Sequence, residues 1–443
     1  MNRTVLLFTA PSFLLVRIAL LFYFVGFSNA VFSQRQREIT LTPRNEGAMT
    51  ELIQNAINTC AADGGGVVYL LEGLFLSGSL ELKSNVTLHL KKGALLKGSD
   101  NVKDYRNDAF IFGKDILNVN IQGEGVIDGV NCVNPNGEEG FRGPHGIKLV
   151  NCRNIKIEGI TIKNAANWAI NCHHCSGAEI KNVSIRGGHD GLHTRFCDDF
   201  NVTGCDFRTG DDAFAGNDNR GFVITNCKIN TSCNGFRMGC YNLTVIDCKF
   251  WGPGEYIHKI QKRNNMLAAF VHFSPKDEAS QLNSSKWRIE NITIDHVDHV
   301  YMYNYIDGLW QTGKPVGSVQ FKNVNATNIL SAFNVIGDSL KQFNLTVKNS
   351  TFSFRNGAID AGNTFEGWNT EALNFFYVRN FKKILLHNVT LNYSGNTSTL
   401  KAIDGNGLLL KDVRFNLNCF KPYTIERVKS VIKRDIRICI PNQ

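Results

Sequence analysis

A short pattern of hydrophobic and polar positions recurs along most of the chain. Each unit is an apolar residue, a variable residue, then Asn, Asp or Gly, followed by alternating apolar and variable residues. It occurs as IEGITI at 157, IKNVSI at 180, VTGCDF at 202, ITNCKI at 224, VIDCKF at 245, IENITI at 289, FKNVNA at 321, VKNSTF at 347, LHNVTL at 386 and LKDVRF at 410. The first steps are 23, 22, 22 and 21 residues, and the later, longer steps indicate insertions or a skipped coil. A period near 22 leaves room for short strands and turns but not for a helix, which predicts a parallel β-helix.

One helix is expected before the repeat. Apolar residues return at helical spacing from Leu52 to Cys60, which predicts a short amphipathic helix near residues 49–61, and Gly64–Gly66 ends it. Such a helix would cover the otherwise unpaired end of the coil stack. We therefore expect an all-β, single-domain parallel β-helix over residues 31–443, with at least nine coils between about residues 80 and 418.

The third position of the unit is most often asparagine. Asn tolerates a left-handed backbone and bonds to nearby backbone groups, so it suits a turn between strands. Stacked from coil to coil, these amides are expected to form a structural ladder at Asn182, Asn226, Asn291, Asn323, Asn349 and Asn388.

Composition narrows the class of partner. The chain has 443 residues, 40 glycines, nine prolines and a net charge of +9, which fits a turn-rich folded protein with an anionic partner. Its basic residues are spread out and form no dense run, so we expect no nucleic-acid partner, and an acidic polysaccharide remains.

The N-terminus is typical of an export signal. A positive start at Arg3 precedes an apolar run to about Phe27, and small residues end at Ala30. We expect residues 1–30 to be a signal peptide, with an uncleaved anchor as the alternative. The protein is then secreted, extracellular or periplasmic, with no stable membrane association after cleavage.

The thirteen cysteines suggest packing more than chemistry. Cys205, Cys227 and Cys248 occupy an inward apolar position of the repeat and are expected to be buried thiols. Cys175 and Cys197 are 22 residues apart, about one coil rise, which a disulfide could span. The single C-x-x-C at 172–175 has no second pair at zinc spacing, so we expect no metal and no cofactor.

Carboxylates gather where the repeat is most regular. Asp190 and Asp212 are 22 residues apart, and the same step reaches Trp168 in one direction and Asn234 in the other. With a period near 22 these four positions form one column on one face, and Asp211 adds a third carboxylate. Such crowding moves pKa values apart, as acid/base chemistry requires.

With these motifs in place, the chain resembles glycoside hydrolase family 28, the polygalacturonase-like right-handed parallel β-helix enzymes. The motifs GVIDG at 125–129, NAANW ending at Trp168, HDG at 189–191 and TGDD at 209–212 correspond in order and spacing. Two positions depart from the family. Where the family has G-H-G this chain has Cys233-Asn234-Gly235, and where it has R-I-K this chain has residues 257–260, IHKI.

The resemblance implies hydrolysis by aspartates. Asp211 would be the general acid, and Asp190 and Asp212 would activate water, with inversion at the anomeric carbon. Two flanking anions are also expected to raise the pKa of Asp211. The residues expected to bind substrate are Trp168, His189, His193, Asn234, Arg237, His258 and Lys259.

Three functions remain open on the sequence. The first is a monomeric glycoside hydrolase of pectin-like or other acidic polysaccharides or oligosaccharides, acting on chain ends or on oligosaccharides. The second is a polysaccharide lyase on the same fold, and the third is a non-catalytic carbohydrate-binding β-helix. Three mutually repulsive carboxylates argue against binding alone.

Overall fold

The computed structural model describes residues 37–44, 47–276, 278, 280–305, 310–355, 375–395, 398–417 and 421–439. The expected signal peptide at 1–30 lies outside these residues. Residues 36–443 form one compact unit. Among the described residues, no helix has the length and apolar content needed to span a bilayer.

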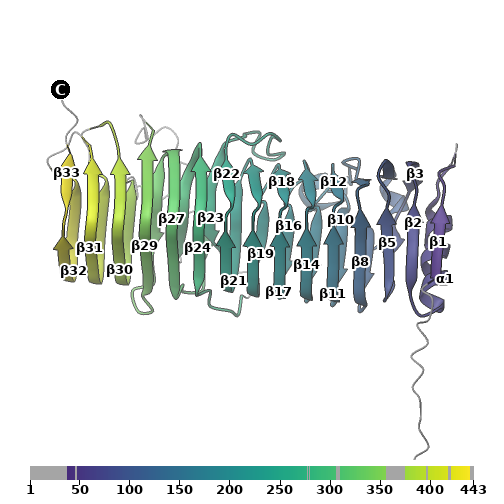
Figure 1. The fold of residues 1–443 in the computed structure, drawn as a ribbon, viewed down its shortest axis with the longest axis horizontal. Helices are drawn as coiled ribbons and strands as arrows, with labels where there is room; N and C mark the ends of the chain where they lie inside the picture. The colour runs from purple at the N-terminus through teal and green to yellow at the C-terminus, as the bar shows by residue number, and fades with distance from the viewer. Residues whose placement is uncertain are drawn as a thin grey trace, which may run out of the picture. The chain divides into compact units, whose positions relative to one another are not determined.

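The fold is a right-handed parallel β-helix, whose strands stack side by side from coil to coil (Figure 1). Three parallel sheets run along the stack. The first, called here the site sheet, contains β4 (Leu80–Glu81), β7 (Ala109–Lys114), β10 (His145–Val150), β13 (Ile170–His173), β16 (Leu192–Arg195), β19 (Phe214–Thr225), β21 (Asn234–Ile246), β23 (Met266–His272), β25 (Val297–Tyr305), β28 (Ser331–Ile336), β30 (Phe376–Asn392), β31 (Leu400–Asn416) and β32 (Tyr423–Arg434).

The other two sheets complete each coil. The second contains β1 (Arg37–Leu41), β2 (Gly66–Leu70), β5 (Val86–Leu90), β8 (Leu117–Gly123), β11 (Arg153–Glu158), β14 (Ser176–Lys181), β17 (Asp198–Thr203), β24 (Trp287–Asp295), β27 (Ser318–Ile329) and β29 (Phe343–Phe354), with the later parts of the long strands β19, β21, β30 and β31. The third contains β3 (Gly73–Ser77), β6 (Ala94–Gly98), β9 (Val126–Asp128), β12 (Thr161–Lys163), β15 (Ser184–Arg186), β18 (Asp206–Thr209), β20 (Lys228–Thr231), β22 (Lys249–Trp251) and β33 (Arg437–Cys439), with the last parts of β24, β27, β29, β30 and β31 between β22 and β33. The short β26 (Gln311–Thr312) pairs with β25.

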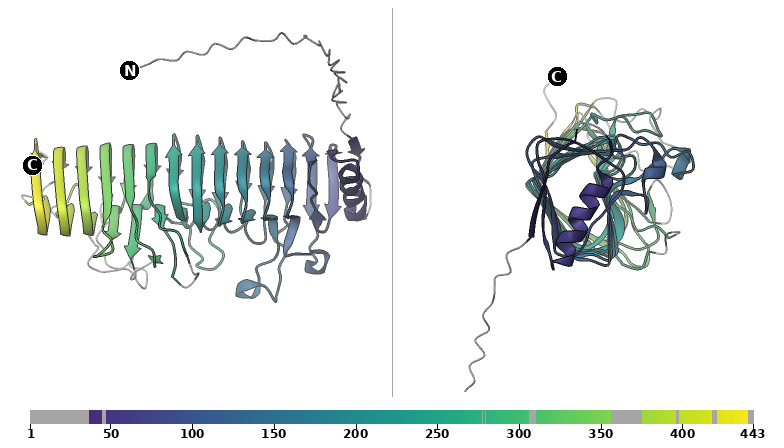
Figure 2. Two further views of the ribbon diagram at one scale, coloured as in Figure 1. Left: turned by 90° about the horizontal axis from the view of Figure 1, so that it is seen from below. Right: turned by 90° about the vertical axis from the view of Figure 1, so that its right-hand side faces the viewer.

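The register confirms the predicted repeat. The first residues of the ten units pair in order, from Ile157 with Ile180 through to Leu386 with Leu410. The 44-residue step is an insertion and not a skipped coil, because Val245 pairs directly with Ile289. The connections gather on one side of the stack (Figure 2, left).

The asparagine ladder is also confirmed. All six predicted asparagines have a left-handed backbone, with φ between 50° and 57°. In the later coils the amides bond in sequence, since Asn323 donates to Asn291 at 2.8 Å and Asn388 donates to Asn349 at 3.1 Å. The ladder therefore marks the turn at the same place in successive coils.

Aromatic side chains stack inside the coils. Phe214 lies on Phe236 with ring centroids 4.5 Å apart, and Phe236 lies 5.2 Å from Phe270. All three are fully buried, and each contributes roughly 1.5–3 kcal/mol through burial. Leu192 pairs with Phe214 in the same inward row, and because side chains alternate along a strand, the residues that follow Leu192 and Phe236, His193 on β16 and Arg237 on β21, face outward.

The first end of the stack carries the predicted helix. Helix α1 (Thr50–Ala62) lies across the open end of the coils (Figure 2, right) and buries Ile53, Ala56, Ile57 and Cys60. The stack begins earlier than expected from the sequence, because β1 pairs with β2 ahead of residue 80. Strand β1 is a single strand before the helix, outside the repeat, and the pattern did not reveal it.

The described cysteines are free thiols. Cys205, Cys227 and Cys248 are buried, as predicted. Cys175 and Cys197 are both free, so the disulfide considered from their spacing is not formed. Instead each thiol donates to a backbone carbonyl at 3.4 Å.

Candidate active site

The predicted column forms on one edge of the site sheet. The N–H that follows Trp168 donates to the carbonyl of Asp190 at 2.9 Å, and the next two coils repeat this bond to Asp212 and Asn234, also at 2.9 Å. The four residues therefore lie on successive coils, with Trp168, Asp190 and Asp212 just before strands β13, β16 and β19 and Asn234 at the start of β21.

Three carboxyl groups converge there. Oxygen atoms of Asp190, Asp211 and Asp212 all lie within 4.8 Å of one another. Their side chains differ in exposure, at 16% for Asp211, 3% for Asp190 and 1% for Asp212. Asp211 is thus the carboxylate that solvent or a substrate reaches most easily.

Asp212 is surrounded by hydrogen-bond donors. Its Oδ1 accepts from the backbone N–H of Asn234 at 3.1 Å and from the Asn234 side-chain amide at 2.8 Å. Its Oδ2 accepts from Nε of Arg237 at 2.5 Å. Burial raises the pKa of Asp212 above its ordinary value, and the charge of Arg237 opposes this rise without cancelling it. All three neighbours are hydrogen-bond donors, an arrangement that favours the ionised form of Asp212.

Asn234 and Arg237 therefore lie behind the carboxylate. Asn234 is fully buried, and its contact with substrate stays a prediction. The guanidinium of Arg237 is 16% exposed and lies over the rings of Phe273 and Trp310, at 4.5 and 5.2 Å. Both residues position Asp212.

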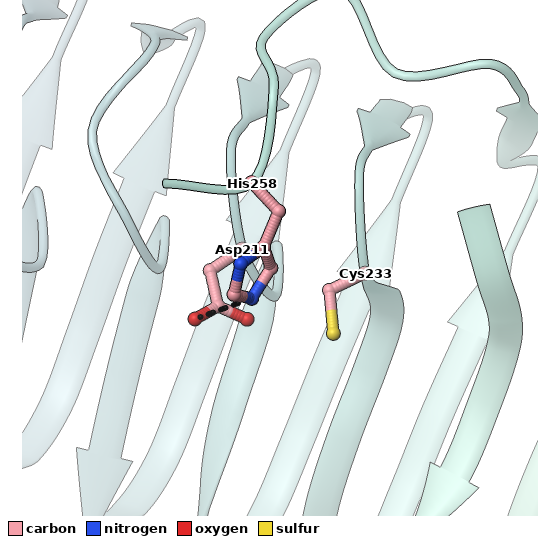
Figure 3. Close-up of side chains that lie close together, drawn as sticks. All are labelled: Asp211, Cys233 and His258. Carbon is pink, nitrogen blue, oxygen red and sulfur yellow. Dashed lines mark ion pairs between the residues drawn. The ribbon is translucent and has the colours of Figure 1, made fainter. Parts of the chain in front are cut away.

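Asp211 faces a histidine from a later connection. His258 lies between β22 and β23, and its Nε2 is 3.4 Å from Oδ2 of Asp211 (Figure 3). Its Nδ1 accepts from the backbone N–H groups of Ile260 and Gln261, at 3.3 and 3.1 Å. Nδ1 therefore carries no proton, and the proton of the neutral ring lies on Nε2 and faces Asp211.

The proton on Nε2 of His258 disfavours metal binding at this place. Asp211, Cys233 and His258, whose side chains are drawn in Figure 3, offer ligand atoms within 4.8 Å of one another. A metal needs the lone pair of the coordinating nitrogen, but Nε2 of His258 holds a proton. The three residues thus fit a hydrogen-bonded pair beside a buried thiol better than a metal centre.

The cations around Asp211 correct the electrostatic prediction. Burial raises the pKa of Asp211, but the bond from His258 and the charges of Arg237 and Arg142 outweigh it, so that the pKa is lowered. We expected the two neighbouring carboxylates to raise this pKa. That expectation was wrong because the sequence pattern did not reveal the three basic groups around the turn.

Asp190 has a different partner. Within the described residues, its side chain has one hydrogen-bond partner, Nδ1 of His193 at 2.8 Å. The His193 ring lies flat on Trp168, with centroids 3.5 Å apart and planes 3° from parallel. Burial raises the pKa of Asp190 well above its ordinary value, and the charges of Asp211 and Asp212 raise it further. Burial holds the pKa of His193 well below its ordinary value.

Arg142 was missed by the sequence analysis. It lies in the connection between β9 and β10, outside the repeat, and its Nη2 is 3.9 Å from Oδ2 of Asp211. It also donates to Glu139 at 2.6 Å and to Asn167 at 3.3 Å. One arginine in a connection gives no periodic signal, so only the structure could place it.

The last two predicted residues lie near the same connection. Nζ of Lys259 donates to Asn131 at 2.8 Å, and burial lowers the pKa of Lys259 to about 8. His189 stacks on Phe141 at 5.8 Å, and burial lowers the pKa of His189 to about 3. The structure thus gathers all ten predicted site residues around the column, with His258 and Lys259 supplied by a connection and not by a strand.

Beyond Arg237 the outward face of the site sheet is covered. The strand neighbours of Asn234 and Arg237 on β23 are Ala268 and Val271. Both are buried and pack with Met302, and Trp310 covers them. The open part of the site therefore ends at Arg237.

Comparison with known proteins gives consistent matches. The family model for glycosyl hydrolases family 28 matches residues 65–240. An endo-polygalacturonase of Pectobacterium parmentieri is 26% identical over 48% of this chain and 64% of its own length, and a probable polygalacturonase of Vitis vinifera is 24% identical over 38% and 40%. The matches thus span less than two thirds of these relatives. The family 28 exopolygalacturonase of Yersinia enterocolitica has the same fold, with a TM-score of 0.55 and 18% identity over 89% of this chain and 78% of that one.

Proposed function

We propose that the chain, whose residues 65–240 match the family model for glycosyl hydrolases family 28, hydrolyses glycosidic bonds in pectin or a related acidic polysaccharide. The observation that carries the proposal is the convergence of three carboxyl groups whose oxygen atoms lie within 4.8 Å. Hydrolysis needs one protonated acid for the leaving oxygen and one carboxylate to activate water. Two or more carboxyl groups at one place supply both.

Basic groups around the carboxylates support an acidic substrate. Arg142 and Lys259 come from two connections on the open side of the column, and Lys259 has a lowered pKa of about 8 because of burial, Arg142 and Lys262. An anionic sugar would relieve the repulsion among these cations. A uronate-containing polysaccharide is therefore the substrate class we propose.

We further propose action near a chain end. The buried positions at Ala268 and Val271 support this, because a long polysaccharide crossing the column would need an open face beyond Arg237. An enzyme of this kind releases mono- or disaccharides from the start of the reaction. Early release of long oligosaccharides would contradict it.

The proposed mechanism inverts the anomeric carbon, as the family resemblance implies. The carboxylate oxygens are closer together than the roughly 6.5–9.5 Å that is usual between the carboxyl groups of inverting enzymes. Nuclear magnetic resonance of the first product would decide the stereochemistry. Retention would remove inversion from the proposal and leave hydrolysis intact.

The functional test is incubation with a panel of polysaccharides that includes polygalacturonate, methyl-esterified pectin and a neutral glucan. We expect new reducing ends with polygalacturonate and none with the neutral glucan. A lyase would instead form a carbon–carbon double bond, seen as ultraviolet absorbance, and a binding protein would form neither product. The matched control is the Asp211→Asn variant, which keeps the size of the side chain.

Secretion and a monomeric state are part of the proposal. The charged start and apolar run of residues 1–30 support export. Expression of the full chain in a secreting host, followed by N-terminal sequencing, should give a mature start near residue 31. Size-exclusion chromatography with light scattering should give the mass of one chain.

A further inference from the structure

The two ends of the coil stack differ. Helix α1 covers the first end, whereas β32 and β33 form the last coil, and no described element lies beyond them (Figure 1). Inward positions that are buried in the preceding coil are therefore exposed in the last one. Val431 is 37% exposed, while Leu408, with which it pairs, is 2% exposed. Ile438 is 45% exposed, while its partner Phe415 is fully buried. The last coil thus offers apolar side chains to a partner.

The same coil is strongly basic. Residues 421–439 contain six basic and two acidic side chains. Arg427 forms ion pairs with Asp404 and Glu426. In the part of the chain that the structure describes, no ion pair is formed by the four other exposed cations Lys429, Lys433, Arg434 and Arg437. This end therefore carries positive charge that the described residues do not neutralise, which favours an anionic partner.

Lys433 occupies an inward position of the repeat. It pairs with Leu410, the first residue of the last predicted unit, which is fully buried. Its Nζ lies 4.5 Å from the ring centre of Tyr423. An inward-pointing charge at the edge of a sheet opposes pairing with a further strand. A strand of another protein, or the same end of a second copy of this chain, is therefore disfavoured here.

Cations and apolar side chains line one hollow of the last coil. Its volume is about 600 Å³, and its lining residues are Ile425, Arg427, Val428, Lys429, Val431 and Lys433. The outer edge of β32 adds backbone N–H and C=O groups that no described strand pairs, and these can bond to hydroxyl groups. A uronate has an apolar C–H face, hydroxyl groups and a carboxylate on each ring. A polymer of uronates therefore matches all three features of this surface.

We propose that the last coil is a second binding site for an acidic polysaccharide, separate from the carboxylate column. On the site sheet β32 lies six strand spacings beyond β21, about 29 Å at roughly 4.8 Å for each spacing. A polymer bound there is tethered near the column, which raises its effective concentration at the site of reaction. The inference rests on the proposed function for the identity of the polymer alone.

Affinity electrophoresis in gels that contain polygalacturonate tests the binding site. All proteins carry Asp211→Asn, which should prevent digestion of the polymer. We expect Lys429→Gln with Lys433→Gln to raise the dissociation constant at least about fivefold at low salt, because two exposed cations are lost. Should the double variant not fold, Lys429→Gln alone serves, with a smaller rise.

The matched control lies near the other end of the stack. Lys91→Gln with Lys92→Gln removes the same charge, and Nζ of Lys91 likewise lies 4.5 Å from a tyrosine ring centre, that of Tyr69. This control should bind polygalacturonate as the parent protein does. Equal dissociation constants for the two double variants would overturn the proposal.

Other ligands decide the class of partner. We expect no binding of a neutral glucan, and weaker binding of dextran sulfate, whose charge is on sulfate groups. If dextran sulfate binds as tightly as polygalacturonate and depends equally on the two lysines, the surface attracts anions in general and the assignment to uronates is overturned. If vesicles of anionic lipid depend on the two lysines and polygalacturonate does not, a membrane partner replaces the proposal.

Kinetics separate this inference from the proposed function. In the active protein, loss of Lys429 and Lys433 should raise KM for polygalacturonate about threefold or more, with kcat unchanged. Both constants should stay unchanged for trigalacturonate, which is too short to reach both sites. If the wild type binds polygalacturonate through the two lysines but cleaves no polysaccharide, hydrolysis is rejected and the binding site is supported. If it cleaves polygalacturonate and the double variant binds and reacts as the control does, hydrolysis is supported and the inference is rejected.

Discussion

The turns that carry Asp190 and Asp212 lie one coil apart, and both bury their carboxyl groups almost completely, at 3% and 1% exposure. Their partners differ in kind. Asp212 is held by Arg237 and two N–H groups of Asn234, whereas Asp190 meets one imidazole. Burial raises the pKa of both carboxyl groups, but at Asp212 the guanidinium that opposes this rise is also a hydrogen-bond partner, so equal burial of the same side chain leads to different electrostatic settings.

The largest expected effect is the loss of kcat in Asp211→Asn, which tests whether the carboxylate cluster acts in the reaction. Asp211→Asn should lower kcat by roughly 10²–10⁴-fold, the usual value of a positioned acid or base. The measurement is reducing-end formation with polygalacturonate, with folding checked by circular dichroism. Asp198→Asn, at an exposed position on β17, is the matched control and should keep wild-type turnover. Full activity in Asp211→Asn would exclude the carboxylate cluster from catalysis.

Removal of the Arg237 guanidinium should lower the free energy of unfolding through its effect on the carboxyl group of Asp212. Arg237→Met leaves a buried carboxylate without its counter-ion, and we expect a loss of about 3–5 kcal/mol in the free energy of unfolding near neutral pH. The loss should shrink toward pH 4, where Asp212 can be protonated. Denaturant unfolding at the two pH values measures it. Arg220→Met, exposed on β19, is the control, and an equal loss in both variants would mean that Arg237 contributes no more than surface packing.

The Asp190 turn should show the opposite dependence on pH. A carboxyl group with a raised folded-state pKa stabilises the fold below its unfolded pKa of about 3.9, and this contribution is lost as pH rises toward the folded pKa. In that window the wild type should lose up to about 1.4 kcal/mol per pH unit through this group. Asp190→Asn should lack this slope, as measured by thermal unfolding between pH 4 and pH 8. A stability gap between variant and wild type that does not widen with pH would contradict a raised pKa.

The smallest effect is expected at Asn234. Asn234→Ala removes the side-chain bond to Asp212 but keeps the backbone N–H at 3.1 Å. We expect kcat to fall by about tenfold, equivalent to one hydrogen bond of about 1.5 kcal/mol to a charged group. The assay is the one used for Asp211→Asn. A loss as large as that of Asp211→Asn would make Asn234 a participant in the chemistry and not a support for Asp212.

The stacked coils could be predicted from the sequence because each unit follows the same rule. The inward position is apolar, the turn position favours a left-handed asparagine, and these local preferences place Ile157 on Ile180 and so on to Leu410. The column of Asp190 and Asp212 follows from the same period. Within the repeat, residues one period apart in the sequence are therefore neighbours in space.

The charges around the column could not be predicted in this way. Arg142 and His258 come from connections before β10 and before β23, where the chain leaves the period. Their side chains decide the pKa of Asp211, which the column alone led us to expect in the wrong direction. The repeat thus indicated where the carboxylates lie, but the protonation of each depends on connections with no periodic pattern.

Proton nuclear magnetic resonance of galacturonate oligosaccharides during digestion tests the central claim most directly, because one spectrum reports cleavage, product class and anomer. The account predicts new reducing-end signals, first in the anomer opposite to that of the cleaved bond, and no vinylic proton signal. Unchanged oligosaccharides after prolonged incubation with folded protein, or a vinylic signal that grows with cleavage, would contradict a hydrolase built on Asp190, Asp211 and Asp212.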